Sequence, residues 1–143
     1  MTTAELLTAL QTELATRISY DATIMYTRVA DLVEIASRRV ILKPAGFEIS
    51  RTGKSDPRRL FLVDLISEER VAAEDVEATA QTRVAEFEEV ANSFTRSPWL
   101  GVSTAFCLAV KTFGDAPGAV NTQIVEGGLA LVLSGVQFTF VEN

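Results

Sequence analysis

Residues 59–94 contain two apolar patterns in succession, in the run RLFLVDLISEERVAAEDVEATAQTRVAEFEEVANSF. Residues 60–66 are apolar apart from Asp64, so residues 59–67 are expected to form a strand that is buried on both faces. Asp64 itself is expected either near a sheet edge or paired with a partner. From Glu74 to Phe94 the apolar residues recur every three or four positions, and acids stand at the start, so this stretch predicts an amphipathic helix. A buried strand followed by a long helix predicts a domain that mixes both elements.

The rest of the chain supplies another helix and several strands. Thr2 and Glu5 fit a capping box, and leucines at every fourth position behind it predict a helix over 3–17. Strands are expected where β-branched and aromatic residues gather, at 19–29, 39–42 with a continuation at 47–50, 104–113, and 129–141 with a bulge at Ser134-Gly135. We therefore expect residues 1–143 to form a single α+β domain with a mobile basic loop at about 51–58. Its sheet should be mixed or mainly antiparallel, with four to six strands flanked by two main helices.

The chain contains no histidine and a single cysteine, Cys107. Catalytic triads, Cys–His pairs and most metal sites need these residue types, so those classes of site are excluded, as is an internal disulfide. Cys107 lies between Phe106 and Leu108, where a small buried apolar side chain is expected. Gly53-Lys54-Ser55 resembles the end of a phosphate-binding loop, but the glycine required five positions earlier is Glu48. We expect no enzyme activity, no metal and no cofactor.

Two neighbouring segments carry opposite charge. Residues 38–59 contain seven bases and two acids, whereas residues 66–90 contain eight acids and two bases. The whole chain has a formal charge of −6, which argues against general nucleic-acid binding. The two segments either pair within one molecule or form complementary faces between copies, because charge complementarity guides register between partners.

The ends and the hydropathy of the chain bear on its location. No apolar run approaches the roughly 20 residues that a bilayer-spanning helix needs. The first residues lack the basic region and apolar core of a secretory signal. We expect a protein that is made in the cytoplasm and has no membrane partner.

Several short motifs follow an N-terminal helix in order along the chain. They are Pro44, Ser50-Arg51, Val63-Asp64-Leu65, the helix from Glu74 to Phe94, and Phe138-Thr139-Phe140. This order resembles bacteriophage tail terminator and tail-completion (neck) proteins. The resemblance implies a homohexameric ring that caps the tail tube, stops its polymerisation and joins it to the head-tail connector or stopper protein. It also implies assembly in the host cytoplasm, a final location in the tail or neck of the virion, and DNA that passes through the lumen without specific binding.

The resemblance carries over no catalytic, cofactor-binding or metal residue. The basic loop, which could reach the next subunit or the tube, and the only tryptophan supply the candidate interface residues Arg51, Lys54, Arg58, Arg59 and Trp99. Trp99 is either a lid on the core beneath the second helix or an interface anchor, since tryptophan is enriched among binding hot spots. The alternatives are another neck or tail-tube subunit, a small dimeric α+β domain for ligand binding or regulation, and lastly a carboxylate enzyme without histidine.

Overall fold

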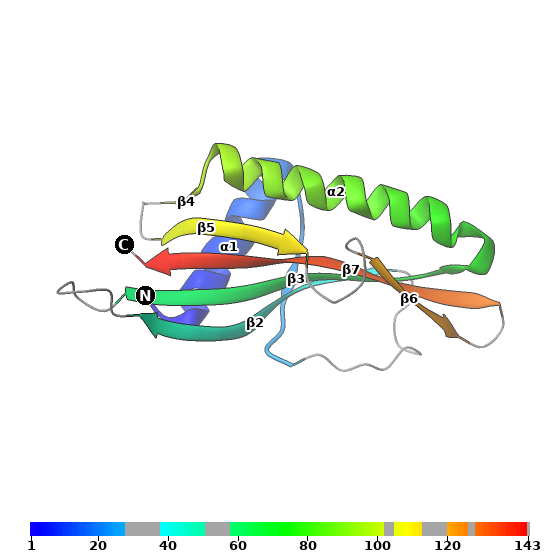
Figure 1. The fold of residues 1–143 in the computed structure, drawn as a ribbon, viewed down its shortest axis with the longest axis horizontal. Coiled ribbons are helices and arrows are strands. Elements are labelled where there is room, and N and C mark those ends of the chain that lie inside the picture. Colours follow the sequence, from blue (N-terminus) through cyan, green and yellow to red (C-terminus); the bar gives the residue numbers. More distant parts are fainter. Residues whose placement is uncertain (28–37, 51–57, 102–104, 113–119, 126–127, 143) are drawn as a thin grey trace.

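The structure is a computed structural model and describes residues 1–27, 38–50, 58–101, 105–112, 120–125 and 128–142. Two α-helices and seven strands lie within these ranges (Figure 1). Their order along the chain is α1 (Thr3–Ile18), β1 (Thr23–Ile24), β2 (Arg38–Ser50), β3 (Arg58–Ala72), the short 3-10 helix η1 (Ala73–Asp75), α2 (Val76–Arg96), β4 (Trp99–Leu100), β5 (Ala105–Thr112), β6 (Val120–Val125) and β7 (Leu129–Glu142).

The seven described strands form one sheet in the order β1-β2-β3-β7-β5-β4, and β6 also pairs with β7. β1 is parallel to β2, whereas the other described pairs are antiparallel. The predicted α+β class, with a mixed sheet and two main helices, is confirmed. Five of the described strands have six or more residues, in line with the four to six expected, and the two-residue strands β1 and β4 extend the sheet further.

The first helix forms where its capping box and leucine spacing place it. The Glu5 N–H donates to Thr2 Oγ1 (3.2 Å), and the Thr2 N–H donates to the Glu5 carboxylate (2.7 Å). The N–H bond from Thr2 holds the pKa of this carboxyl below its usual value. Four leucines of α1 are buried without remaining exposure, namely Leu6, Leu7, Leu10 and Leu14. The cap thus satisfies backbone groups at the helix start, while the leucine stripe fixes the face that packs inward.

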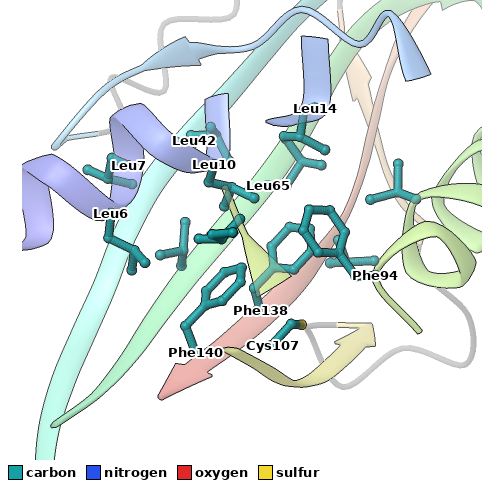
Figure 2. Close-up of a cluster of buried hydrophobic side chains, with 14 of the residues drawn as sticks. Leu6, Leu7, Leu10, Leu14, Leu42, Leu65, Phe94, Cys107, Phe138 and Phe140 are labelled. Carbon is teal, nitrogen blue, oxygen red and sulfur yellow. The ribbon is translucent and has the colours of Figure 1, made fainter. Parts of the chain in front are cut away.

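The hydrophobic core lies between the two helices and one face of the sheet (Figure 2). Alternate residues of the two long central strands point into it, and they are Phe61, Val63 and Leu65 of β3 and Val136, Phe138 and Phe140 of β7. Phe94 joins α2 to this sheet, because its ring meets those of Phe138 and Phe140 edge to face, with centroids 5.1 and 6.2 Å apart. Such aromatic pairs contribute about 0.5–1.5 kcal/mol each beyond the burial of apolar area.

The opposite face of the sheet, called the open face below, carries the alternating residues that point away from the helices. It includes Leu60, Leu62 and Asp64 of β3 and Gln137, Thr139 and Val141 of β7, all of them half-buried. Neither of the described helices covers this face, since both belong to the core cluster on the other side. In Figure 1 the strands lie in front of α1. The fold therefore buries one face of its sheet and presents the other.

The strand expected over residues 19–29 is wrong for its first residues. Ser19 adopts the left-handed backbone conformation, with φ 52°, and its N–H donates to the Ala15 carbonyl (3.1 Å). The Tyr20 N–H likewise donates to the carbonyl of Leu14 (3.1 Å). These bonds turn the chain back against α1. Of the described residues in the stretch 19–29, only Thr23–Ile24 form a strand.

Bulges occur at other places than expected. The two strand pieces expected at 39–42 and 47–50 are one strand, β2, with a register shift between Pro44 and Gly46. The bulge expected at Ser134-Gly135 is wrong, because the register between β3 and β7 is continuous there. At this point β7 instead changes its other neighbour, from β5 to β6. A second shift lies in β5, between Cys107 and Ala109. Both shifts are in strands at the sides of the sheet, where bulges are common.

The remaining expectations differ mainly in their boundaries. The helix expected over 74–94 is α2 preceded by η1, and the strand expected over 59–67 continues to Ala72. Asp64 is paired, since its carboxylate accepts a hydrogen bond from the Gln137 amide (2.9 Å). Most of the loop expected at 51–58 lies outside the described residues, and so do its candidate interface residues Arg51 and Lys54. Arg58 is described and begins β3.

Candidate assembly surface

The predicted interface residues that the structure describes lie toward one end of the sheet. This end, where β3 begins at Arg58, is called the hairpin end below. Trp99 of β4 pairs with Phe106 of β5, and the same cross-strand row continues through β7 to Leu60 of β3. The sheet topology therefore brings Trp99 to the same end as Arg58 and Arg59, although about 40 residues separate them in the sequence.

Arg58 and Arg59 differ in what they contact. Arg58 is exposed at the first position of β3. Arg59 is half-buried, and its Nη1 donates to the carbonyl of Met1 (3.2 Å). Its guanidinium also lies over the rings of Phe47 and Phe61, 5.8 Å from each centroid. Arg59 therefore stabilises the hairpin end from within, whereas the Arg58 side chain is exposed.

Four of the five large apolar side chains that are exposed in the described part of the chain belong to this end of the sheet. Their exposed fractions are 62% for Phe47, 57% for Ile49, 54% for Leu108 and 39% for Trp99, whereas the fifth, Tyr26, follows β1. Sequence reasoning found Trp99 and missed Phe47 and Ile49. Their alternation around a glutamate was a signal for a strand with one apolar side, but only the topology shows that this side is uncovered.

Trp99 packs on the open face and not beneath α2. Its ring meets that of Phe106 edge to face, with centroids 4.9 Å apart. The neighbouring residue Leu100 is the one that closes the core, at 1% exposure. Arg17 fixes the position of this segment, because it donates to the carbonyls of Ser97 and Trp99. The lid expected at Trp99 is therefore Leu100, and the interface role of Trp99 stays a prediction.

Part of the charge polarity is used within the molecule. Three ion pairs join the sheet to itself or to α2, and they are Arg38–Glu86 (2.6 Å), Arg83–Glu69 (2.8 Å) and Arg39–Glu68. A fourth pair, Arg83–Glu86 (3.1 Å), lies within α2. The hydroxyl of Tyr20 donates to Glu86 (3.2 Å), and burial together with this carboxylate raises the pKa of Tyr20. Intramolecular pairing is thus the correct interpretation for Arg38 and Arg39. Within the described part of the chain, this pairing does not involve Arg58, nor the exposed acids of η1 and α2.

The described side chains supply contact surface and little reactive chemistry. Burial raises the pKa of the Cys107 thiol to about 11, so the thiol is protonated near neutral pH. No group of three or more Cys, Asp and Glu residues within the described ranges could hold a metal ion. A hollow of about 500 Å³ lies beside α1, but the carboxylates on its rim already have partners. Glu5 belongs to the capping box, and Glu13 accepts bonds from Arg17 (2.6 Å) and the Gly101 N–H (3.0 Å).

Comparison with known proteins adds no assignment to this geometry. No known family model and no curated protein matches the chain. Within the described ranges, no helix is long and apolar enough to cross a membrane.

Proposed function

We propose that this protein is a structural subunit of a tailed bacteriophage, a tail terminator that forms a ring. The ring would cap the tail tube, join it to the head-tail connector and let DNA pass without binding it specifically. The observation that carries this proposal is the gathering of exposed Phe47, Ile49, Leu108 and Trp99 toward the end of the sheet that begins at Arg58. Large apolar patches on the surface of a soluble protein mark sites that bind a protein, a membrane or a ligand.

The composition of this region also suits protein contacts. Aromatic residues and arginine are enriched in interfaces, and the hairpin end combines Phe47 and Trp99 with Arg58 and Arg59. The apolar residues lie on both lateral sides of the sheet, since Ile49 belongs to β2 and Leu108 to β5. Two different patches on one subunit are the arrangement that a head-to-tail ring needs, because such a ring joins unlike surfaces.

Light scattering behind a sizing column, over a wide range of protein concentrations, together with negative-stain images, tests this proposal. We expect rings that bind the ends of purified tail tubes. Long stacked tubes would instead favour a tail-tube subunit, and a stable dimer would favour the small regulatory or ligand-binding domain. A monomer at every concentration that does not bind tubes would overturn the proposal.

A charge reversal at the hairpin end provides a second measurement. Arg58→Glu should weaken ring formation, because an exposed arginine at an interface would become a repulsive carboxylate. Glu88→Lys is the matched control, since Glu88 is exposed on α2, away from this end. Equal assembly of both variants and the wild type would remove Arg58 from the interface.

A further inference from the structure

Both lateral sides of the sheet have strand edges that no other described strand covers. On one side β1 pairs only with Ile41 and Leu42, so β2 has no described neighbour there from Lys43 onward. On the other side β4 pairs only with Ala105 and Phe106, so β5 has none from Leu108 onward. The backbone N–H and C=O groups of such edges are ready to pair with a strand of another chain.

The two edges have the directions that a head-to-tail contact needs. Each of the pairs β2–β3, β3–β7 and β7–β5 is antiparallel, so β2 and β5 run in opposite directions on opposite sides of one sheet. Copies related by rotation about an axis along the strands would therefore bring β2 of one copy beside β5 of the next in antiparallel orientation. Antiparallel pairing is slightly more stable per residue than parallel pairing.

The regular parts of both edges are short and similar in length. In β2 the stretch after the shift at Gly46 ends at Ser50, and in β5 the stretch after the shift begins at Ala109 and ends at Thr112. Bulges discourage pairing with arbitrary strands. The stretches 47–50 and 109–112 are the parts of these edges in which a regular antiparallel ladder can form.

One register within these stretches matches both charge and apolar side chains. Antiparallel pairing of 47–50 with 109–112 places Glu48 opposite Lys111 and Ile49 opposite Val110. Glu48 and Lys111 both belong to the open face and are both exposed, and neither has an ion-pair partner among the described residues. Ile49 and Val110 both belong to the helix-side face. Opposite charges and apolar pairs directly across a ladder are stabilising.

The alternative register is unfavourable. Lys43 and Lys111 lie in the same cross-strand row, that of Asp64 and Gln137. If the rows of two neighbouring copies were continuous, Lys111 of one copy would therefore face Lys43 of the next. Like charges directly opposite are destabilising. If β5 of one copy is shifted toward the hairpin end of the next copy, Lys111 no longer faces Lys43 and instead lies opposite Glu48.

A groove beside the edge of β5 provides space for Ile49. It has a volume of about 250 Å³ and lies between the end of α2 and β5, lined by residues that include Phe94, Leu108 and Val110. Phe94 and Cys107, which line this groove, both belong to the core cluster shown in Figure 2. Ile49 is 57% exposed in its own subunit, so docking in this groove would remove apolar surface from water.

We infer that β2 of one copy extends the sheet of the next copy by pairing with β5, with Ile49 in the groove against Val110 and Glu48 opposite Lys111. This inference rests on the proposed function, because it takes the partner to be a second copy of the chain. It adds the surfaces, the strand direction and the register of the contact.

A charge exchange tests the register. Glu48→Lys and Lys111→Glu should each weaken association, by up to about fivefold per contact, whereas the variant with both changes should regain most of the wild-type affinity. Within one molecule β3 and β7 lie between the strands that carry the two residues, so β2 and β5 are roughly 14 Å apart at the usual strand spacing. Rescue in the combined variant therefore cannot arise from a contact inside one subunit. Glu88→Lys on α2 is the control that should leave association unchanged.

A disulfide pair tests the proximity directly. In a Cys107→Ala background, Ile49→Cys with Val110→Cys should link assembled subunits into a ladder of covalent multimers on a non-reducing gel, since opposed residues of a ladder lie within disulfide reach. Tyr26→Cys with Val110→Cys should give no ladder, because Tyr26 is exposed but is not on the edge of β2.

The outcomes separate this inference from the proposed function. Wild-type rings with charge rescue and a ladder support both. Wild-type rings that neither respond to the charge exchange nor give a ladder overturn the β2–β5 contact and leave the ring intact. Rescue and a ladder in open filaments support the contact and overturn the terminator. A wild-type protein that stays monomeric overturns both.

Discussion

Replacement of Arg17 by methionine should destabilise the protein by cutting contacts that join three segments. Nε of Arg17 donates to Glu13 one turn earlier on α1 (2.6 Å), and its Nη atoms donate to the carbonyls of Ser97 and Trp99. The guanidinium also lies over the ring of Phe94, 4.6 Å from the centroid. Methionine keeps the apolar stem in place, so the Arg17→Met variant removes mainly the polar and cation–π contacts.

The size of the loss follows from these contacts. The cation–π contact at this partly buried site is worth about 1 kcal/mol, and the two bonds to backbone carbonyls about 0.5–1 kcal/mol each. The ion pair with Glu13 adds about 0.3–0.5 kcal/mol. The total is about 2.3–3.5 kcal/mol. For a chain of 143 residues, an unfolding entropy of about 2.1 cal/mol/K per residue converts this loss to a fall in Tm of about 8–12 °C.

The only tryptophan makes the measurement direct. Trp99 is 39% exposed, and its carbonyl is one of the two that Arg17 holds, so its fluorescence in urea reports both global unfolding and local release of β4. Arg17→Lys is the control, because lysine keeps the charge but lacks the planar fork that reaches two carbonyls and a carboxylate together. We expect the free energy of unfolding of Arg17→Lys to lie between those of wild type and Arg17→Met. If the free energy of unfolding of Arg17→Met lies within about 0.5 kcal/mol of the wild-type value and the Trp99 emission is unchanged, the contacts of Arg17 do not stabilise the fold as described.

Three further predictions concern the core. Phe138→Ala should cost about 3–5 kcal/mol in urea unfolding, because Phe138 is fully buried and its ring contacts those of Phe94 and Phe140; a loss under 1 kcal/mol would contradict the packing. Ser134→Ala should be neutral or stabilising in the same assay, because the Ser134 hydroxyl is buried and has no hydrogen-bond partner among the described residues; a clear loss would show that the hydroxyl is satisfied. Cys107 should react slowly with iodoacetamide at pH 8 in the native state and fast in urea, since its pKa is raised to about 11. The fold favours the protonated thiol, so its contribution to stability is constant below about pH 8.5 and falls as pH rises toward 11; the Cys107→Ala variant should lack this alkaline loss.

The helices were predictable because their signals are local. The capping box of Thr2 and Glu5 and the leucine spacing behind it act within single turns, and the structure places α1 over Thr3–Ile18. The same holds for the stripe of α2, whose Phe87 and Phe94 are buried as the spacing requires. Patterns with a period of three to four residues survive in any fold that buries one side of a helix.

The strands were less predictable because their limits depend on distant partners. The polar run Glu68-Glu69-Arg70 looked like the end of a strand, yet β3 continues through it. Glu68 stays in the sheet at 1% exposure because Arg39 of β2 pairs with it, and Glu69 pairs with Arg83 of α2. The strand β6 was not anticipated at all. Such elements form only once the neighbouring strand is present, and the sequence of either strand alone does not reveal the pairing.

The candidate surface was predictable only in part for the same reason. The basic residues and the tryptophan stand out in any sequence, and Arg58, Arg59 and Trp99 do come to one end of the sheet. Phe47 and Ile49 look like ordinary strand residues, because exposure depends on whether another strand or helix lies over them. Only the sheet order, with β2 at its side, shows that nothing described covers them.

The one-sided core has a consequence for how such a chain can change over time. The residues that hold the fold together, such as Phe94 and Phe138, face the helices, whereas the residues available to partners, such as Ile49 and Trp99, lie at the edges or on the open face. Substitutions in the second group should alter which surfaces recognise one another at little cost to folding. A protein built in this way can follow a diverging partner step by step, with its scaffold unchanged while its contact residues drift.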